Sequence, residues 1–504
     1  MFARVSCPMA VIGVLLWGVV APAAHGAAPP KQSTLTIDDA SVAEGDAGRT
    51  AELFTVRLAP STSKIVSVDF ATADGSAGAG DYVPASGTLV FAKGQTTKQV
   101  SVDVTGDSSA EADETFVVRL TNARNAVIGD ALAQGTILND DAPPPPPSSA
   151  ATAYQIDPAH TGAAADAVAP VPSRAWSRDL GGSTSYPLIV GGRVYVTVAN
   201  TSSYGTRLFA LNASDGATAW TADLPGTYYW SAITYDAGRI FAVNYDGVMT
   251  AYDAVTGGLQ WTTQMPGQYS FSSPPTARAG YVYTGGAGSG GTLYAVRQDN
   301  GAVAWTAPVA NGDNSSPAVS SSGVYVSYAC GVSYAFAPTS GALQWNRVTG
   351  CSGGGGKTPV LGAGKLYVRD SSYPAILDAG TGSLLAPFPS SGPAPALDAS
   401  KRYVLTGTTL RAENLASGSS AWQFSGDGQL RSAPIVAAGT VFVGSSSGNL
   451  YGLSSATGAI TWSANVGSAI AAPDEQNVSQ PLTGLATAGG LLVVPADRTL
   501  SAYR

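Results

Sequence analysis

Ala251-Tyr252-Asp253-Ala254-Val255-Thr256-Gly257, followed by Trp261, is one copy of a turn that recurs through the second half of the chain. In each copy a glycine follows a turn residue, and in most copies a tryptophan stands four positions after it. Short apolar runs such as Arg193–Val196 separate the turns. Units of about 40 residues, with about four short strands each, predict a β-propeller. The turn glycines are Gly216, Gly257, Gly301, Gly341, Gly382, Gly418 and Gly458.

The opening strands predict eight such units, or blades, within an all-β chain. The last unit, residues 482–504, has room for only about three strands. Ala175-Trp176-Ser177 matches the strand that follows each turn, so we expect it to supply the missing fourth strand. Pairing the N- and C-terminal strands closes the ring and hides the sheet edges that a linear array would expose.

The recurring tryptophans suggest either a binding surface or a structural role. One tryptophan per unit favours the structural role, because a large ring in that place fills the space between neighbouring sheets. Only the unit of Gly382 lacks it, since Ala386 stands there.

The turn and the stretch Tyr154–Gly162 resemble the pyrroloquinoline-quinone-type propeller repeat. The resemblance covers about 154–504 and implies an eight-bladed propeller. Enzymes with this fold are quinoprotein dehydrogenases, which hold the quinone above a calcium ion with an aspartate base. Other members are not enzymes and scaffold outer-membrane assembly.

Residues 33–139 form a different pattern, in which apolar and polar residues alternate over short runs. Examples are Leu53–Leu58, Ile65–Phe70, Lys98–Val104 and Thr115–Leu120. This alternation marks strands with one buried face, and about seven such runs predict a β-sandwich. Residues 31–141 carry 16 acidic and 8 basic side chains, so nearly all of the chain's net charge of −8 belongs here. The acidity argues against nucleic-acid binding.

Several motifs in this region resemble the Calx-β domain. They are Ser41–Gly45, Asp74–Tyr82, Gly87–Leu89, Glu111–Phe116 and Gly135–Asp141. The resemblance covers 33–141 and implies a seven-stranded sandwich that binds calcium at one tip. The candidate ligands are Glu44, Asp74, Asp81, Asp107, Asp113, Asp140 and Asp141.

Acids gathered at one end of a sandwich repel each other, and calcium relieves this because it takes six to eight oxygen ligands. The sequence departs from calcium-sensing members at Val83-Pro84-Ala85 and at Asn139, where acids are common. We therefore expect fewer or weaker calcium sites. The alternative is that the acids cap loops and bind no metal.

Short segments indicate the boundary between the two domains and a signal at the N-terminus. Pro143–Pro147 adopts an extended polyproline helix, so 142–150 is a linker between 33–141 and 154–504. Residues 1–26 combine Arg4, an apolar core and small residues, and predict a cleaved signal peptide rather than a membrane anchor. We expect a secreted or periplasmic protein with no membrane span. Without the signal, Cys330 and Cys351 remain, and they predict one disulfide.

The propeller region contains few groups suited to catalysis. Glu413 and Glu475 are its only glutamates and His160 is its only histidine. Because acid–base chemistry needs a cluster of such groups, we expect a non-enzymatic binding, scaffold or adhesion protein. The alternative is a quinone-dependent dehydrogenase, since several aspartates fall in loops of the candidate face. Calcium is the expected cofactor, and pyrroloquinoline quinone is not expected.

The loops of one propeller face carry the candidate ligand residues. Aromatic loop residues favour contact with a saccharide, a peptide or a protein, and the other interpretation is that they plug the channel. Each aspartate has a plain alternative role in stabilising its turn. We expect a monomer. The candidates are Tyr228, Tyr229, Trp230, Tyr269, Asp313, Lys357 and Asp370.

Overall fold

The computed structural model describes residues 32–504 except 46–47, 107–112, 140–149, 170 and 350–354. Contacts divide the chain into two compact units, the first ending at Asn139 and the second running to Arg504. The described residues form strands, with one short 3-10 turn at Ala329–Gly331 (η1). No helix in these ranges is long and apolar enough to cross a membrane.

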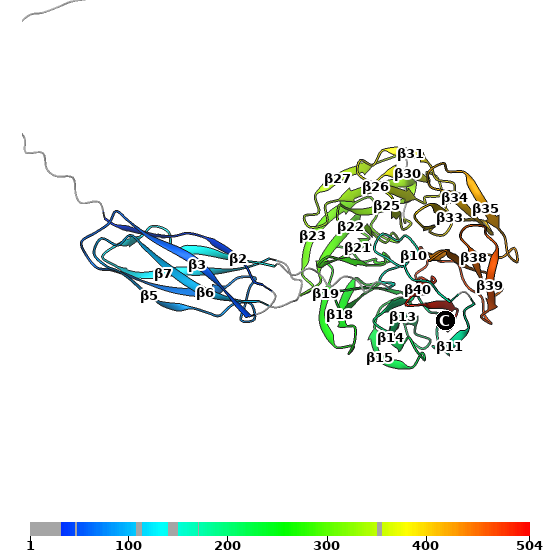
Figure 1. Ribbon diagram of the computed structural model, residues 1–504, viewed down its shortest axis with the longest axis horizontal. Coiled ribbons are helices and arrows are strands. Elements are labelled where there is room, and N and C mark those ends of the chain that lie inside the picture. Colours follow the sequence, from blue (N-terminus) through cyan, green and yellow to red (C-terminus); the bar gives the residue numbers. More distant parts are fainter. Residues whose placement is uncertain (1–31, 46–47, 107–112, 140–149, 170, 350–354) are drawn as a thin grey trace, which may run out of the picture. The chain divides into compact units, whose positions relative to one another are not determined.

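The first unit is a sandwich of two sheets, and Figure 1 shows its long paired strands. One sheet has the order β6-β3-β1-β8 and the other the order β2-β9-β7-β4-β5. The strands are β1 (Thr34–Ile37), β2 (Ala40–Ala43), β3 (Gly48–Ala59), β4 (Val66–Asp74), β5 (Ser86–Phe91), β6 (Thr97–Gly106), β7 (Glu114–Arg124), β8 (Val127–Ile128) and β9 (Leu132–Leu138).

The described part of this unit has nine strands where we expected seven. The N-terminal residues contribute a strand to each sheet: β1 pairs antiparallel with β3, whereas β2 pairs parallel with β9 in the other sheet. Asp38 and Asp39 lie at the crossing, where Arg57 binds the first and the amide of Gln134 donates to the second. The two-residue β8 adds the ninth strand, parallel to β1.

The alternating pattern produces the sandwich core. In β3 the buried residues Phe54, Val56 and Leu58 alternate with exposed or half-buried ones. Phe116 of β7 lies 5.8 Å from the ring of Phe54 and stacks at 4.4 Å on Tyr82. Such ring pairs add to the free energy of burial and hold the two sheets together.

The second unit contains eight sheets among its described residues, arranged around a common centre like the blades of a propeller (Figure 1). In most sheets four consecutive strands pair antiparallel, and the last strand lies at the outer rim in Figure 1. The first four of these sheets contain β12 (Leu188–Val190), β13 (Arg193–Ala199), β14 (Thr206–Asn212), β15 (Thr218–Leu224), β16 (Ser231–Asp236), β17 (Arg239–Asn244), β18 (Val248–Asp253), β19 (Leu259–Gln264), β20 (Thr276–Arg278), β21 (Tyr281–Ala287), β22 (Gly291–Arg297), β23 (Val303–Val309), β24 (Ala318–Val319), β25 (Val324–Tyr328), β26 (Val332–Phe336) and β27 (Leu343–Arg347).

Three further sheets follow along the chain, each with four consecutive strands. A two-residue strand from the start of the unit joins the last of these sheets as a fifth strand. They contain β10 (Ala163–Ala164), β28 (Val360–Gly362), β29 (Lys365–Val368), β30 (Ala375–Asp378), β31 (Leu384–Pro387), β32 (Ala396–Leu397), β33 (Lys401–Thr406), β34 (Thr409–Asn414), β35 (Ser420–Phe424), β36 (Ile435–Ala437), β37 (Thr440–Gly444), β38 (Asn449–Ser454) and β39 (Ile460–Asn465).

The remaining sheet joins distant parts of the chain. It has the order β11-β42-β41-β40, with β11 (Arg174–Asp179) from the start of the unit and β40 (Ala486–Ala488), β41 (Leu491–Ala496) and β42 (Thr499–Tyr503) from its end. Backbone bonds between Ser173 and Arg504 extend the ladder. An ion pair of 3.2 Å between Arg498 and Asp179 lies at the other end of β11.

The repeated tryptophans lie on the last strands of their sheets and dock onto the next sheet. Trp261 Nε1, for example, donates to the carbonyl of Gln298 at 2.8 Å. A Cβ on the turn glycine Gly301 would lie 2.5 Å from the Trp261 ring, so the ring needs the missing side chain. Gly418 has nothing within 4 Å of such a Cβ, because Ala386 stands in the tryptophan position of the sheet before it.

Candidate functional site

The segment before the repeats follows the inner strands of the propeller. The amides of Ile189 and Tyr235 donate to the carbonyls of Ala151 and Thr152. Further along, four inner-strand amides donate to carbonyls between Pro158 and Gly162, and β10 then pairs with β36. The four donors are Val319, Leu361, Leu397 and Val436. The segment therefore fills the space among the inner strands of several sheets.

His160 lies within this segment and is fully buried. Its Nδ1 is 2.7 Å from the carbonyl oxygen of Tyr154, and its Nε2 is 3.0 Å from that of Pro317. Burial lowers the pKa of His160. The neutral ring that this favours donates from one nitrogen only, and the Thr276 hydroxyl, 3.5 Å from Nε2, can donate to the other. The side chain therefore packs between the segment and the residue that precedes β24.

A buried ion pair lies beside this segment. Arg369, which follows β29, donates to both carboxylate oxygens of Glu475 at 2.8 and 2.6 Å. The two side chains are 2% and 4% exposed. Arg369 also donates to the carbonyls of Thr358 and Gly392, so the long connection between β39 and β40 is fastened to the sheet of β28–β31. Bidentate pairing compensates the cost of burying both charges.

The sequence analysis did not identify this buried ion pair. The available signal was Glu475 itself, one of two glutamates in the region, placed in an unusually long connection between strands. Nothing in the sequence marks Arg369 as its partner, because 106 residues separate them.

Lys357 and Asp313 lie in the same part of the unit. Lys357 Nζ donates to the carbonyl of Ser391. Burial, and then the nearby charge of Arg369, lower the pKa of Lys357. Burial raises the pKa of Asp313, whose Oδ1 has no hydrogen-bond partner among the described residues.

Asp370 has the plain turn role. One of its carboxylate oxygens accepts from the amides of Ser372 and Tyr373, and the other accepts from the amide of Cys330 at 3.0 Å. Cys330 is 8% exposed and has a positive φ of 67°. Thr349 Oγ1 donates to the Cys330 carbonyl at 2.6 Å. Cys351, the expected disulfide partner, lies outside the described residues.

The aromatic candidates divide into exposed and buried side chains. Tyr228 and Tyr269 are 41% and 69% exposed, and Tyr229 is half-buried. Trp230 is 2% exposed and packs in the core with Tyr186 and Leu224, so it does not belong to the ligand-accessible surface. The apolar bulk of Trp230 is more stable inside the unit than in the loop surface where we expected it.

The candidate calcium ligands that the structure describes lie towards one end of the sandwich. The ladders place the ends of β2, β4 and β9 beside the start of β7, because Ala43 pairs with Leu138, Glu114 with Ile137, and Asp74 with Phe116. The candidates Glu44, Asp74 and Asp113 lie in or next to these strand ends. Asp81 lies in the connection between β4 and β5, and its carbonyl accepts from the amide of Thr105 near the end of β6.

Each described acid is positioned by the protein. Tyr82 Oη donates to Asp74 at 2.6 Å, and the Gly78 amide donates to Asp81 at 2.7 Å. The Asn139 amide donates to Asp113 at 3.1 Å, and Glu44 is 6% exposed. Carboxylate oxygens are the ligands that calcium prefers, so the donor chemistry fits.

The described part of this tip contains no group of three or more acids, histidines or cysteines placed to hold a metal. Asp107, Asp140 and Asp141 lie outside the described residues, as does Glu111. The calcium site remains a prediction that depends on the combined set.

Glu52 is a second residue that the sequence analysis missed. It points into the sandwich from β3 and is 1% exposed. Its Oε1 accepts from the Thr136 amide at 3.2 Å, and its Oε2 has no hydrogen-bond partner among the described residues. Burial raises the pKa of Glu52 to about 7, although the Thr136 bond opposes this. The alternation that marks β3 would have revealed a carboxylate at an inward position.

Comparisons with known proteins agree with this architecture. A family model described as outer membrane protein assembly factor BamB, PQQ_2, matches residues 165–328 and 329–494. The Calx-beta domain model matches residues 30–142. The sodium/calcium exchanger 3 of Mus musculus is 44% identical over 86 residues, or 17% of this chain and 9% of the exchanger. Sodium/calcium exchanger 2 of Homo sapiens is 49% identical over 65 residues, or 13% and 7% of the two chains.

Solved structures resemble the propeller at low identity, which shows the fold alone. BamB from Moraxella catarrhalis has a TM-score of 0.52 and 19% identity, over 66% of this chain and all of that one. The quinohemoprotein alcohol dehydrogenase ADHIIG from Pseudomonas putida HK5 has a TM-score of 0.56 and 13% identity, over 71% and 80%. The chain therefore belongs to the PQQ_2 family and carries a Calx-beta domain before its propeller repeats.

Proposed function

We propose that the chain is an exported, calcium-binding and non-enzymatic protein whose propeller presents a ligand surface for binding, scaffolding or adhesion. The observation that carries the non-enzymatic part is that His160 and the Arg369–Glu475 pair have structural roles. Both are buried and bonded to the surrounding protein, so neither is free to act on a substrate. We further infer that the eight sheets are blades of one ring, closed where β11 pairs with β42.

The calcium part of the proposal has two supports. The exchangers that resemble the sandwich are named for sodium and calcium. In addition, Glu44, Asp74 and Asp113 lie in or next to strand ends that the ladders bring together, and Asp81 lies in the connection that follows Asp74. We propose that they bind calcium together with Asp107, Asp140 and Asp141. A bound ion would stiffen the loops at this end of the sandwich.

We also propose a Cys330–Cys351 disulfide and a signal peptide at 1–26. The Thr349–Cys330 hydrogen bond supports the disulfide, because it brings the chain close to Cys330 two residues before Cys351. A disulfide suits an oxidising compartment, as expected for a secreted or periplasmic protein.

The experiment is a calorimetric titration of the full, chelator-treated protein with calcium and then with pyrroloquinoline quinone. We expect calcium binding that Asp81→Asn weakens at least about tenfold, because calcium affinity depends on the charge of its ligands. Asp130→Asn is the matched control: it removes an exposed acid next to β9 at the opposite end of the sandwich. Stoichiometric quinone binding would instead support a dehydrogenase.

A further inference from the structure

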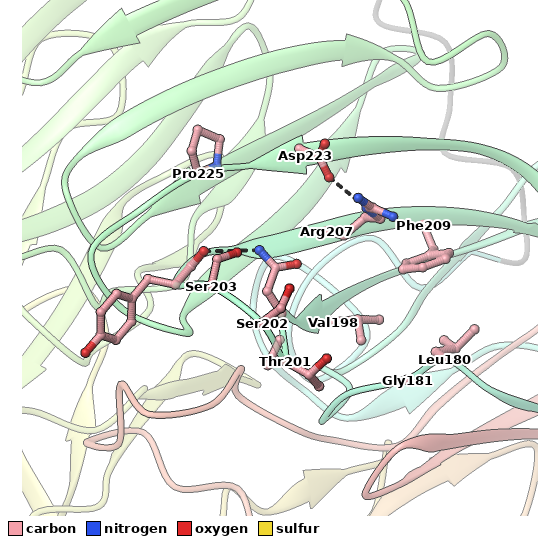
Figure 2. A pocket seen from close by; sticks show the side chains of 13 residues that line it. Leu180, Gly181, Val198, Thr201, Ser202, Ser203, Arg207, Phe209, Asp223 and Pro225 are labelled. Atoms are coloured by element: carbon pink, nitrogen blue, oxygen red, sulfur yellow. Dashed lines mark hydrogen bonds and ion pairs between the residues drawn. The ribbon is translucent and has the colours of Figure 1, made fainter.

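A groove of about 450 Å³ opens beside the sheet that joins the two ends of the unit (Figure 2). One wall consists of β13, β14 and β15, and the other includes Leu180 and Gly181, which follow β11. The groove therefore lies between two neighbouring sheets.

A row of side chains crosses the first wall. Val198 of β13 pairs with Arg207 of β14, which pairs with Asp223 of β15. Arg207 Nε lies 2.7 Å from Asp223 Oδ1, and both side chains remain about half exposed or more, at 49% and 70%. Figure 2 shows this ion pair together with Val198 of the same wall and with Thr201 and Ser202 of the loop that follows β13. The pair holds two hydrogen-bonding groups in place, and their exposed atoms remain accessible to a ligand.

The loop between β13 and β14 supplies hydroxyl groups and an aromatic ring. Thr201, Ser202 and Ser203 are exposed on it, and Asn200 Nδ2 donates to the carbonyl of Tyr204 at 3.2 Å. That bond holds the loop across its base. Tyr204 is 60% exposed at the edge of the groove.

A second pocket of about 290 Å³ shares part of this lining. It adds Tyr229, Ser183 and Ser479, together with Asp497 and Arg498. The rings of Tyr204 and Tyr229 lie 5.0 Å apart, so the aromatic pair spans both pockets.

The lining chemistry selects one class of ligand. Two arginines and two aspartates leave the combined lining without net charge, which disfavours anions and polycations. A sugar ring has an apolar C–H face and a rim of hydroxyls, and these match a tyrosine ring beside fixed carboxylate, guanidinium and hydroxyl groups. We propose that this groove binds a neutral oligosaccharide. The proposal rests on the binding function proposed above and names its ligand class.

The test is a titration of the full protein with neutral hexasaccharides: cellohexaose, laminarihexaose, maltohexaose and chitohexaose. We expect at least one to bind, and Tyr204→Ala to weaken binding about tenfold, which is the loss of one ring contact of about 1.4 kcal/mol. Tyr373→Ala is the control, because Tyr373 is also exposed, at 42%, but lines neither pocket. Both variants should unfold close to the temperature of the parent protein, since both rings are exposed.

Three results would overturn the saccharide proposal. They are the absence of binding for all four sugars at millimolar concentration, equal losses in the two tyrosine variants, and selection of peptides that Tyr204→Ala abolishes. None of them bears on calcium or quinone binding, so the calorimetric experiment above still decides the proposed function separately.

Discussion

Two glutamates, one in each unit, are almost fully buried, but the groups around their carboxylates differ. Glu475 of the propeller is bidentate with Arg369 and also accepts from the Thr358 amide. Glu52 of the sandwich has one backbone bond and a second oxygen without a partner among the described residues. The first environment supplies a cation and the second does not.

The difference shows how each unit manages a buried acid. A buried charge is tolerated when a partner and hydrogen bonds replace water, and otherwise the group becomes neutral. Glu475 follows the first course and fastens a long connection to a distant sheet. Glu52 follows the second, with a pKa raised by burial to about 7.

Breaking the propeller pair should have the largest effect. Arg369→Met removes the cation and leaves the Glu475 carboxylate buried without its partner, so we expect a loss of about 3–5 kcal/mol in the free energy of unfolding. Urea unfolding followed by tryptophan fluorescence reports the propeller alone, because residues 33–141 contain no tryptophan. The double variant Arg369→Met, Glu475→Leu should recover much of the loss, and failure to do so would mean that Arg369 acts through its other bonds.

The sandwich should respond to pH through Glu52. Its folded pKa of about 7 exceeds the ordinary value of 4.5, so the folded state holds its proton more tightly than the unfolded state. The resulting stability is fully present below pH 4.5 and is lost as pH rises through 7, by about 3 kcal/mol in all. Hydrogen exchange of β3 amides at fixed calcium concentration measures this. Glu52→Gln should remove that part of the pH dependence, and an unchanged profile would contradict the assignment.

Most of the architecture could be predicted because it depends on local repeats. The turn glycines and tryptophans predict the sheets, and most of the rings dock on the turn glycine of the next sheet. Alternation predicts the strands of the sandwich, but it does not show that β1 and β2 separate at Asp38 and Asp39. That break depends on partners from β3 and β9, which only the fold brings together.

The candidate sites were harder to predict, because their partners are distant in sequence. Trp230 was expected in a surface loop with its neighbouring tyrosines, but it lies in the core. The groove beside Tyr204 requires β14 and the end of β11 to lie side by side, and no motif marks it. Residue type therefore indicates chemistry, whereas accessibility depends on tertiary packing.

A second ion pair sharpens the comparison at intermediate burial. Arg402 and Glu413 lie 2.6 Å apart, and both side chains are 11% exposed. Arg402→Met should cost about 1–3 kcal/mol, less than Arg369→Met, because water can reach the remaining carboxylate. The same urea titration measures it. An equal or larger loss would point to the contact of Arg402 with the Phe388 ring, 5.7 Å away.

The smallest effect should come from the exposed pair at the groove. Arg207 and Asp223 are 49% and 70% exposed, so solvent screens their attraction and Arg207→Ala should change the free energy of unfolding by less than about 1 kcal/mol. High salt should make that difference smaller still, because it screens the attraction between exposed charges. A larger loss in the urea titration would mean that the ion pair contributes to the stability of the sheet that contains β13, β14 and β15. A small loss would mean that the pair contributes little to folding, which agrees with the ligand role proposed above.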